Sequence, residues 1–147
     1  MAKKDNLQLV KGWVLGQKYS ISEFQDDMML QLLWNCVLDS VEPEVIKYAF
    51  CNTGAGSKLR KLMAEEMIYA FKDQQIEAPD DDRLKRWNGI PVHFTEIANA
   101  QLRYEQDHYF TTRRLDEVEE DEEPKWKEFL IGDGNRLFRR PEDMNED

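Results

Sequence analysis

The apolar residues of the first half of the chain recur every three or four positions, which is the spacing of one face of an α-helix. This spacing predicts helices over about residues 7–18, 21–38, 43–51 and 58–72. Polar and turn-forming residues separate the four segments. The first half of the chain therefore predicts a series of short amphipathic helices, each of which buries one face.

Residues that cap helices stand at the starts of these segments. Asp5 or Asn6 can cap the first helix, and Ser57 can cap the fourth. Ser20 and Glu23 have the spacing of a capping box, in which each side chain accepts a hydrogen bond from the amide of the other residue. We therefore expect Ser20 to begin the second helix, directly after a tight break.

Two glycines, Gly12 and Gly16, lie one turn apart within the first predicted helix. Each is expected to cost about 1 kcal/mol of helix stability relative to alanine. Glycines at this spacing leave room for a second element to approach closely, and we interpret them in this way. The lysines around them exclude the alternative of a dimerisation motif inside a membrane.

Helical spacing is weaker after residue 72. It predicts a short helix around residues 83–87 and a longer helix over about residues 91–108. Together with the first four segments, these elements predict an all-α domain over residues 1–112. We expect an irregular bundle of about five or six helices.

Acidic residues dominate the last part of the chain. Six of the seven residues from 117 to 123 are acidic, and such a run is normally solvated because its charges repel one another. A short apolar motif follows within residues 124–131, of which 129–131 form the only candidate for a strand. Residues 113–147 are therefore predicted to be an acidic, partly disordered tail with a short apolar motif.

The composition fits a globular domain with a very polar exterior, because 41% of the 147 residues are hydrophobic and 34% are charged. Twenty basic and 30 acidic residues give a net charge of −10, which disfavours direct binding to nucleic acids. No apolar run approaches the ~20 residues of a membrane span, and the charged start does not predict a secretory signal. We expect an intracellular protein, nuclear or cytoplasmic, that does not enter membranes.

The residues that most often carry chemistry are few. His93 and His108 have no cysteine or carboxylate at metal-binding spacing. Cys36 and Cys51 lie on apolar faces and are expected to be buried, reduced thiols rather than a disulfide or a nucleophile. The sequence therefore predicts a protein that is not an enzyme and that binds no metal or cofactor.

Asp26-Asp27 and Glu65-Glu66 are pairs of adjacent acids within predicted helices. Neighbouring residues on a helix diverge, so neither pair predicts an acid/base dyad. We expect both pairs to lie on solvated helix faces.

Two stretches of the first half carry a resemblance to a known family. One is Leu9-Val10 followed by Trp13-Val14-Leu15-Gly16 and Lys18-Tyr19, and the other is the segment from Gly56 to Met63. They resemble the last helices of BTB/POZ domains of filamentous fungi, over residues 7–71.

The BTB resemblance implies helices that hold protein partners. The N-terminal sheet and helices that carry the dimer interface of the family are not matched, so we expect only the helical end of such a domain and do not infer dimerisation. In some relatives these helices help to bind the cullin scaffold of a ubiquitin ligase. A substrate adaptor of such a ligase is therefore one alternative function.

Two apolar regions are candidates for contact with a partner. The end of the second helix is apolar on most sides, which indicates either core packing or a partner-binding surface formed by Met29, Leu30 and Leu38. The tail motif belongs either to a disordered tail without a role of its own or to a short linear motif that folds onto a partner or onto this domain. Its candidate contact residues are Trp126, Phe129 and Leu130.

The remaining large apolar residues are expected to form the core, namely Trp13, Phe24, Trp34, Phe50, Leu59 and Phe71. The sequence thus favours a protein–protein interaction module that acts as an adaptor or an assembly subunit. A second alternative is an acidic inhibitor or DNA mimic that blocks a basic nucleic-acid-binding protein.

Overall fold

The computed structural model describes residues 5–38, 41–72, 94–106 and 125–132. Within these ranges the protein is all-α and contains no strand. The elements are α1 (Asn6–Lys18), α2 (Ser22–Leu38), α3 (Pro43–Asn52), α4 (Lys58–Lys72), α6 (Phe94–Gln106) and the 3-10 turn η2 (Lys125–Phe129).

The helices predicted over 7–18, 21–38, 43–51 and 58–72 are confirmed to within one or two residues. The helix expected over 91–108 corresponds to α6. The strand candidate is wrong, because Phe129 ends the 3-10 turn η2. The short helix expected around residues 83–87 lies outside the described residues.

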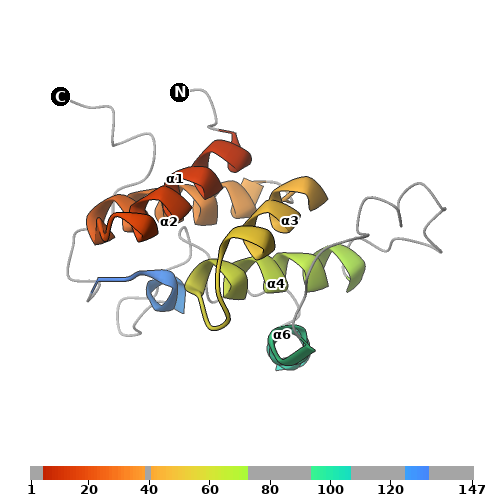
Figure 1. Cartoon of the computed structure of the whole chain (residues 1–147). Coiled ribbons are helices and arrows are strands. Elements are labelled where there is room, and N and C mark those ends of the chain that lie inside the picture. The colour runs from red at the N-terminus through yellow and green to blue at the C-terminus, as the bar shows by residue number, and fades with distance from the viewer. Residues whose placement is uncertain (1–4, 39–40, 73–93, 107–124, 133–147) are drawn as a thin grey trace, which may run out of the picture.

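The helices are arranged around α4, which lies near the middle of the molecule (Figure 1). α1 and α2 pack against each other as a pair, and α3 connects this pair to α4 because it contacts both α1 and α4. α6 packs on α4 on the side that faces away from α1 and α2, and η2 lies against α4 (Figure 1).

Side chains from all of these elements form one core. Its largest fully buried members are Trp13, Phe50 and Phe129, and burial of each apolar side chain of this size contributes roughly 1.5–3 kcal/mol. Of the predicted core residues, Trp13, Phe50 and Leu59 are confirmed as buried. Trp34 is only half-buried, and the side chain of Phe71 lies outside the described residues.

The prediction that Phe24 belongs to the core is wrong, since it is an exposed residue. Its ring lies across the glycine face of α1. A Cβ placed on Gly16 would lie 3.2 Å from Cδ1 of Phe24, and one on Gly12 would lie 3.5 Å from its Cζ. The ring of Phe24 thus lies against the glycines of α1 and stays partly exposed, rather than entering the core.

The expectation that Gly12 and Gly16 permit a close approach is confirmed. A Cβ on Gly12 would lie 2.8 Å from Sδ of Met28, and one on Gly16 would lie 2.7 Å from Cγ of Gln25. Carbon atoms in contact are normally about 3.5–4.0 Å apart. The two glycines therefore set how closely α1 and α2 pack.

Two of the predicted caps are present. The carboxylate of Asp5 accepts a hydrogen bond of 2.7 Å from the amide of Leu7, and the hydroxyl of Ser57 accepts one of 3.1 Å from the amide of Arg60. Pro43 occupies the first turn of α3, where its missing N–H leaves no helix hydrogen bond unmade. Each cap satisfies an amide that would otherwise lack a partner within the helix.

The capping box predicted for Ser20 is wrong, because Ser20 belongs to the end of α1. Its φ is 57°, which is left-handed backbone, whereas an N-cap residue is extended. The amide of Ser20 donates to the carbonyl of Gln17, and the amide of Ile21 donates to that of Gly16 at 2.8 Å. This pair of bonds is a Schellman motif with Tyr19 as the C-cap, and α2 begins two residues after Ser20.

Replacing Ser20 by glycine is expected to stabilise the protein by about 0.5–1 kcal/mol. A serine side chain is strained at positive φ, and glycine relieves this strain at the cost of a more flexible unfolded chain. Urea unfolding followed by circular dichroism measures the change. Ser22→Gly, in the first turn of α2, is the matched control and is expected to destabilise the protein. A loss of stability in Ser20→Gly would contradict the Schellman assignment.

Candidate functional site

Most residues predicted to contact a partner are buried within the molecule. Met29 is 0% exposed and Trp126 is 3% exposed, and Leu30, Phe129 and Leu130 are buried as well. The prediction that these side chains form a free partner surface is therefore corrected. α2 is apolar on several sides because α1 covers one side and the segment around η2 covers another. The side chain of Leu38 lies outside the described residues.

The apolar motif of the predicted tail packs onto the helices of the same chain, which confirms the alternative that it folds onto this domain. We refer to residues 126–132 as the C-terminal segment. Its last amides are held by α2: those of Ile131 and Gly132 donate to the two oxygens of Asp26 at 2.6 Å and 3.0 Å. The segment is part of the core, so the boundary expected at residue 112 does not separate it from the helical domain.

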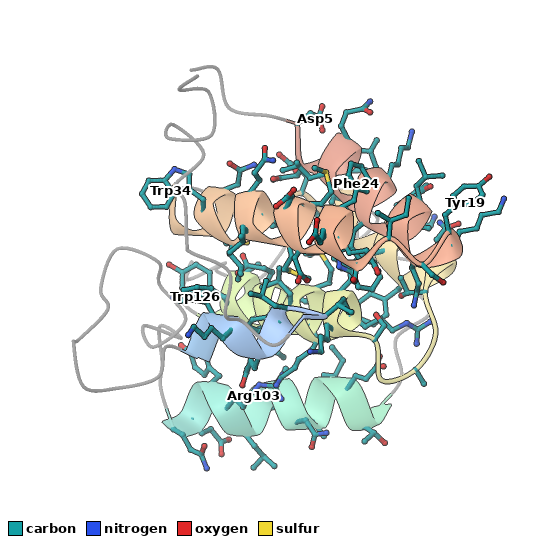
Figure 2. All side chains as sticks on the ribbon, turned by 90° about the vertical axis from the view of Figure 1, so that its left-hand side faces the viewer. Asp5, Tyr19, Phe24, Trp34, Arg103 and Trp126 are labelled. Carbon is teal, nitrogen blue, oxygen red and sulfur yellow. The ribbon has the colours of Figure 1, made fainter. Side chains whose placement is uncertain are left out.

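α4 holds the C-terminal segment from the other side. The ammonium group of Lys58 donates a hydrogen bond to the carbonyl of Leu130. Lys61 forms an ion pair of 2.9 Å with Glu128, and its Nζ lies 5.5 Å from the ring centre of Phe129. Figure 2 shows η2 lying along α4, on the side of α2 that faces away from α1.

Arg60 of α4 is a buried charge that ties three helices together. Its guanidinium donates to the carbonyls of Phe50 and Thr53, at 2.8 Å and 2.7 Å, and to the hydroxyl of Thr53 at 3.1 Å. It also lies 3.6 Å from the carboxylate of Glu96 in α6. The carbonyls are at the end of α3, where a cation interacts favourably with the helix dipole. This arrangement indicates a structural role for Arg60.

Three of the four paired acids are buried, so the expectation of solvated faces is wrong for Asp26, Glu65 and Glu66. Asp27 is half-buried. Glu65 lies 3.5 Å from the guanidinium of Arg103 in α6. The sequence did not signal this burial because the groups that face these carboxylates, such as Ile131 and Arg103, are distant in the chain.

The main exposed apolar surface lies where α1 turns into α2. Only six large hydrophobic residues are exposed among those described, and four of them fall within ten positions. These four form what we call the turn patch: Leu15, Tyr19, Ile21 and Phe24. Leu15 is 51% exposed and Tyr19 is 61% exposed, and Figure 2 shows Tyr19 projecting from the end of the α1–α2 pair.

One feature of the sequence indicates the turn patch, namely the position of Leu15 relative to Trp13. Leu15 lies two positions after the buried Trp13, so the two side chains are about 200° apart around the helix. An apolar residue in that position points away from the core. Ile21 and Tyr19 belong to the turn itself, whose conformation was not predicted correctly.

No group of three or more potential metal-ligating side chains is present in the part of the chain that the structure describes. Neither Cys36 nor Cys51 forms a disulfide bond among the described residues. Cys36 is half-buried and Cys51 is exposed, which corrects the expectation that both are buried. His93 and His108 lie outside the described residues. None of the described helices is both long and apolar enough to cross a membrane.

Comparisons of the whole chain with protein-family models, with curated proteins and with solved structures gave no significant match.

Proposed function

We propose that this protein is an adaptor or assembly subunit, without catalytic chemistry of its own, that binds a protein partner through the turn patch. The observation that carries this proposal is the presence of four exposed large apolar residues within ten positions around the α1–α2 turn, from Leu15 to Phe24. Exposed apolar surface is typical of protein interaction sites when several such side chains lie together. Aromatic residues such as Tyr19 are enriched in the centres of such sites.

The charges beside the turn patch favour a partner with carboxylates. Lys11 and Lys18 are exposed, and α1 contains no acidic residue. Their ammonium groups lie 5.6 Å from the ring centres of Tyr48 and Tyr19 respectively, and neither lysine forms an ion pair within the described residues. Because the Debye length is about 8 Å at physiological ionic strength, these nearby charges act more strongly on a docked partner than the net charge of the chain does.

On the α2 side, the turn patch has a negative charge beside it, because Glu23 lies in the first turn of α2. We therefore expect the carboxylates of the partner to lie along α1. The BTB resemblance of residues 7–71 supports a role in holding partners, and a cullin-ligase adaptor is one form of that role.

The alternative of an acidic inhibitor or DNA mimic has less support. A mimic needs carboxylates arranged along one rigid face. Asp26, Glu65 and Glu66 belong to rigid helices but are buried, so they are not available to imitate phosphates.

The proposal is tested by changing the turn patch alone. The double variant Leu15→Ser/Tyr19→Ser is expected to lose at least about 90% of the partner captured by the full chain, since central residues of an interface each contribute ~2 kcal/mol or more. Its free energy of unfolding should change by less than about 1 kcal/mol because both side chains are exposed. Captured proteins are quantified by mass spectrometry from an extract of the cells that make the protein.

The matched control for this experiment is Leu102→Ser, which removes a 57% exposed apolar side chain from α6. It should capture the same partner as the unchanged chain. Lys18→Glu should weaken capture, and more strongly at low salt. Equal capture by the unchanged chain and by the double variant would show that the turn patch is not the binding surface.

A further inference from the structure

A second binding site is independent of the turn patch. We propose that the face of α2 and α4 that carries Asp26, Lys58 and Lys61 is a peptide-docking site. The C-terminal segment occupies it as an intramolecular ligand. A partner protein with the same Trp-x-x-Phe-Leu pattern binds there when this segment is displaced. Binding of that partner would thus be autoinhibited by the protein's own chain.

The C-terminal segment is built like a short linear motif. Its apolar anchors are Trp126, Phe129 and Leu130, at relative positions i, i+3 and i+4, and all three are buried. Between and after them, Glu128 and Ile131 are exposed. This division into a few buried anchors and exposed neighbours is how short peptides are recognised by a helical surface.

The helices also bind the backbone of the segment, not only its side chains. Asp26 accepts hydrogen bonds from two consecutive amides, those of Ile131 and Gly132, and Lys58 donates one to the carbonyl of Leu130. A buried carboxylate and an ammonium group therefore satisfy the backbone at the end of the motif. These contacts do not depend on the side chains of the peptide, so any peptide with the same anchors and turn can form them.

Apart from its three buried anchors, the segment is held by the hydrogen bonds at its end and by one partly exposed ion pair. The bonds to Asp26 join residues 105 and 106 positions apart, and the single turn η2 has five residues. The ion pair between Lys61 and Glu128 is 34% and 38% exposed at its two side chains, and pairs this exposed contribute little. We therefore expect the segment to leave α2 and α4 without unfolding of the helices.

A segment in the same chain competes with a partner at an effective concentration on the order of mM. A peptide added to the unchanged protein should therefore bind weakly. The peptide should bind more tightly when the attachment of the C-terminal segment to α2 and α4 is weakened.

The test uses a labelled peptide with the sequence of residues 123–134 and the full-length chain. Fluorescence anisotropy should show binding to the variant Trp126→Ala/Phe129→Ala at least about tenfold tighter than to the unchanged chain. A peptide with alanine at the same two anchors should bind at least about tenfold more weakly. The variant Leu15→Ser/Tyr19→Ser should behave as the unchanged chain does, which separates this proposal from the one for the turn patch.

Asp26→Asn, added to the Trp126→Ala/Phe129→Ala variant, should weaken binding of the peptide by about tenfold, because the charge is lost and one of the two acceptor oxygens becomes an NH2 donor. Asp27→Asn is the matched control on the next residue of α2 and should change binding by less than about twofold. Failure of the peptide to bind the folded double variant would overturn the proposal. So would a dimer of the unchanged chain that Trp126→Ala abolishes, since the occupant would then be a second copy.

If the variant Trp126→Ala/Phe129→Ala does not fold, amide hydrogen exchange of the unchanged chain tests whether the segment leaves the helices. The amides of residues 130–132 should exchange at least about tenfold faster than those in the middle of α4, through an opening that leaves the helices intact. Exchange of both sets at the same rate would show that the segment leaves only on global unfolding, and would overturn the proposal.

Discussion

Replacing Trp13 by alanine is expected to lower the free energy of unfolding by about 3–5 kcal/mol. Trp13 is the largest of the fully buried side chains and lies in α1, which contacts both α2 and α3. Alanine would leave a cavity at this junction, because the close approach of α1 and α2 at Gly12 and Gly16 limits how far the two helices can move together. Urea unfolding followed by circular dichroism measures the loss.

Two further variants show whether the loss comes from the buried volume of Trp13. The indole N–H of Trp13 is buried and has no hydrogen-bond acceptor among the described residues, so Trp13→Phe removes apolar volume without breaking a hydrogen bond. It should cost about 1–2 kcal/mol. Leu15→Ala, on the exposed side of the same helix, should change stability by less than about 0.5 kcal/mol. A loss below about 1 kcal/mol for Trp13→Ala would show that α1 is peripheral to the core.

The features that the sequence predicted correctly are local ones. The limits of α1 and α4 follow from apolar spacing and from the side chains of Asp5 and Ser57, all within a few residues of one another. The role of Gly12 and Gly16 was also predictable. Glycine one turn apart in a helix is costly unless another element packs there, and α2 does.

The features that could not be predicted depend on contacts between distant residues. Asp26 was expected to be solvated, yet it is buried because Ile131 and Gly132, more than 100 residues later, bring two amides to it. The same contact places Trp126 in the core rather than on a partner. A burial pattern of this kind is determined by tertiary packing, which the spacing of apolar residues does not specify.

The candidate site was missed for a related reason. Met29 was assigned to a partner surface because α2 is apolar on most sides, but two neighbours of α2 cover those sides. Phe24 was expected in the core because it is a large apolar residue of the second predicted helix. The left-handed backbone at Ser20 instead sets the start of α2 so that this ring lies against Gly12 and Gly16 of α1 and stays partly exposed. A single turn conformation thus exposes a residue of the turn patch.

The burial of Arg60 also depends on distant residues, and replacing Arg60 is expected to have a large effect on the free energy of unfolding. Arg60 is 5% exposed, and its acceptors in α3 and α6 are brought to it by the fold. Arg60→Ala is expected to lower the free energy of unfolding by about 3–5 kcal/mol. The change leaves the carboxylate of Glu96 without its cation and removes the donors to the carbonyls of Phe50 and Thr53. Denaturant unfolding measures the loss.

Lys61→Ala, at the next position of α4, is the matched control. Its ion pair with Glu128 and its contact with the ring of Phe129 are partly exposed, so the loss should be about 1 kcal/mol or less. Arg60→Lys keeps the charge, but an ammonium group lacks the planar guanidinium that reaches three acceptors at once. The loss of stability in Arg60→Lys should therefore lie between those of Arg60→Ala and Lys61→Ala. If Arg60→Ala cost no more than Lys61→Ala, the contacts of Arg60 with α3 and α6 would not stabilise the bundle.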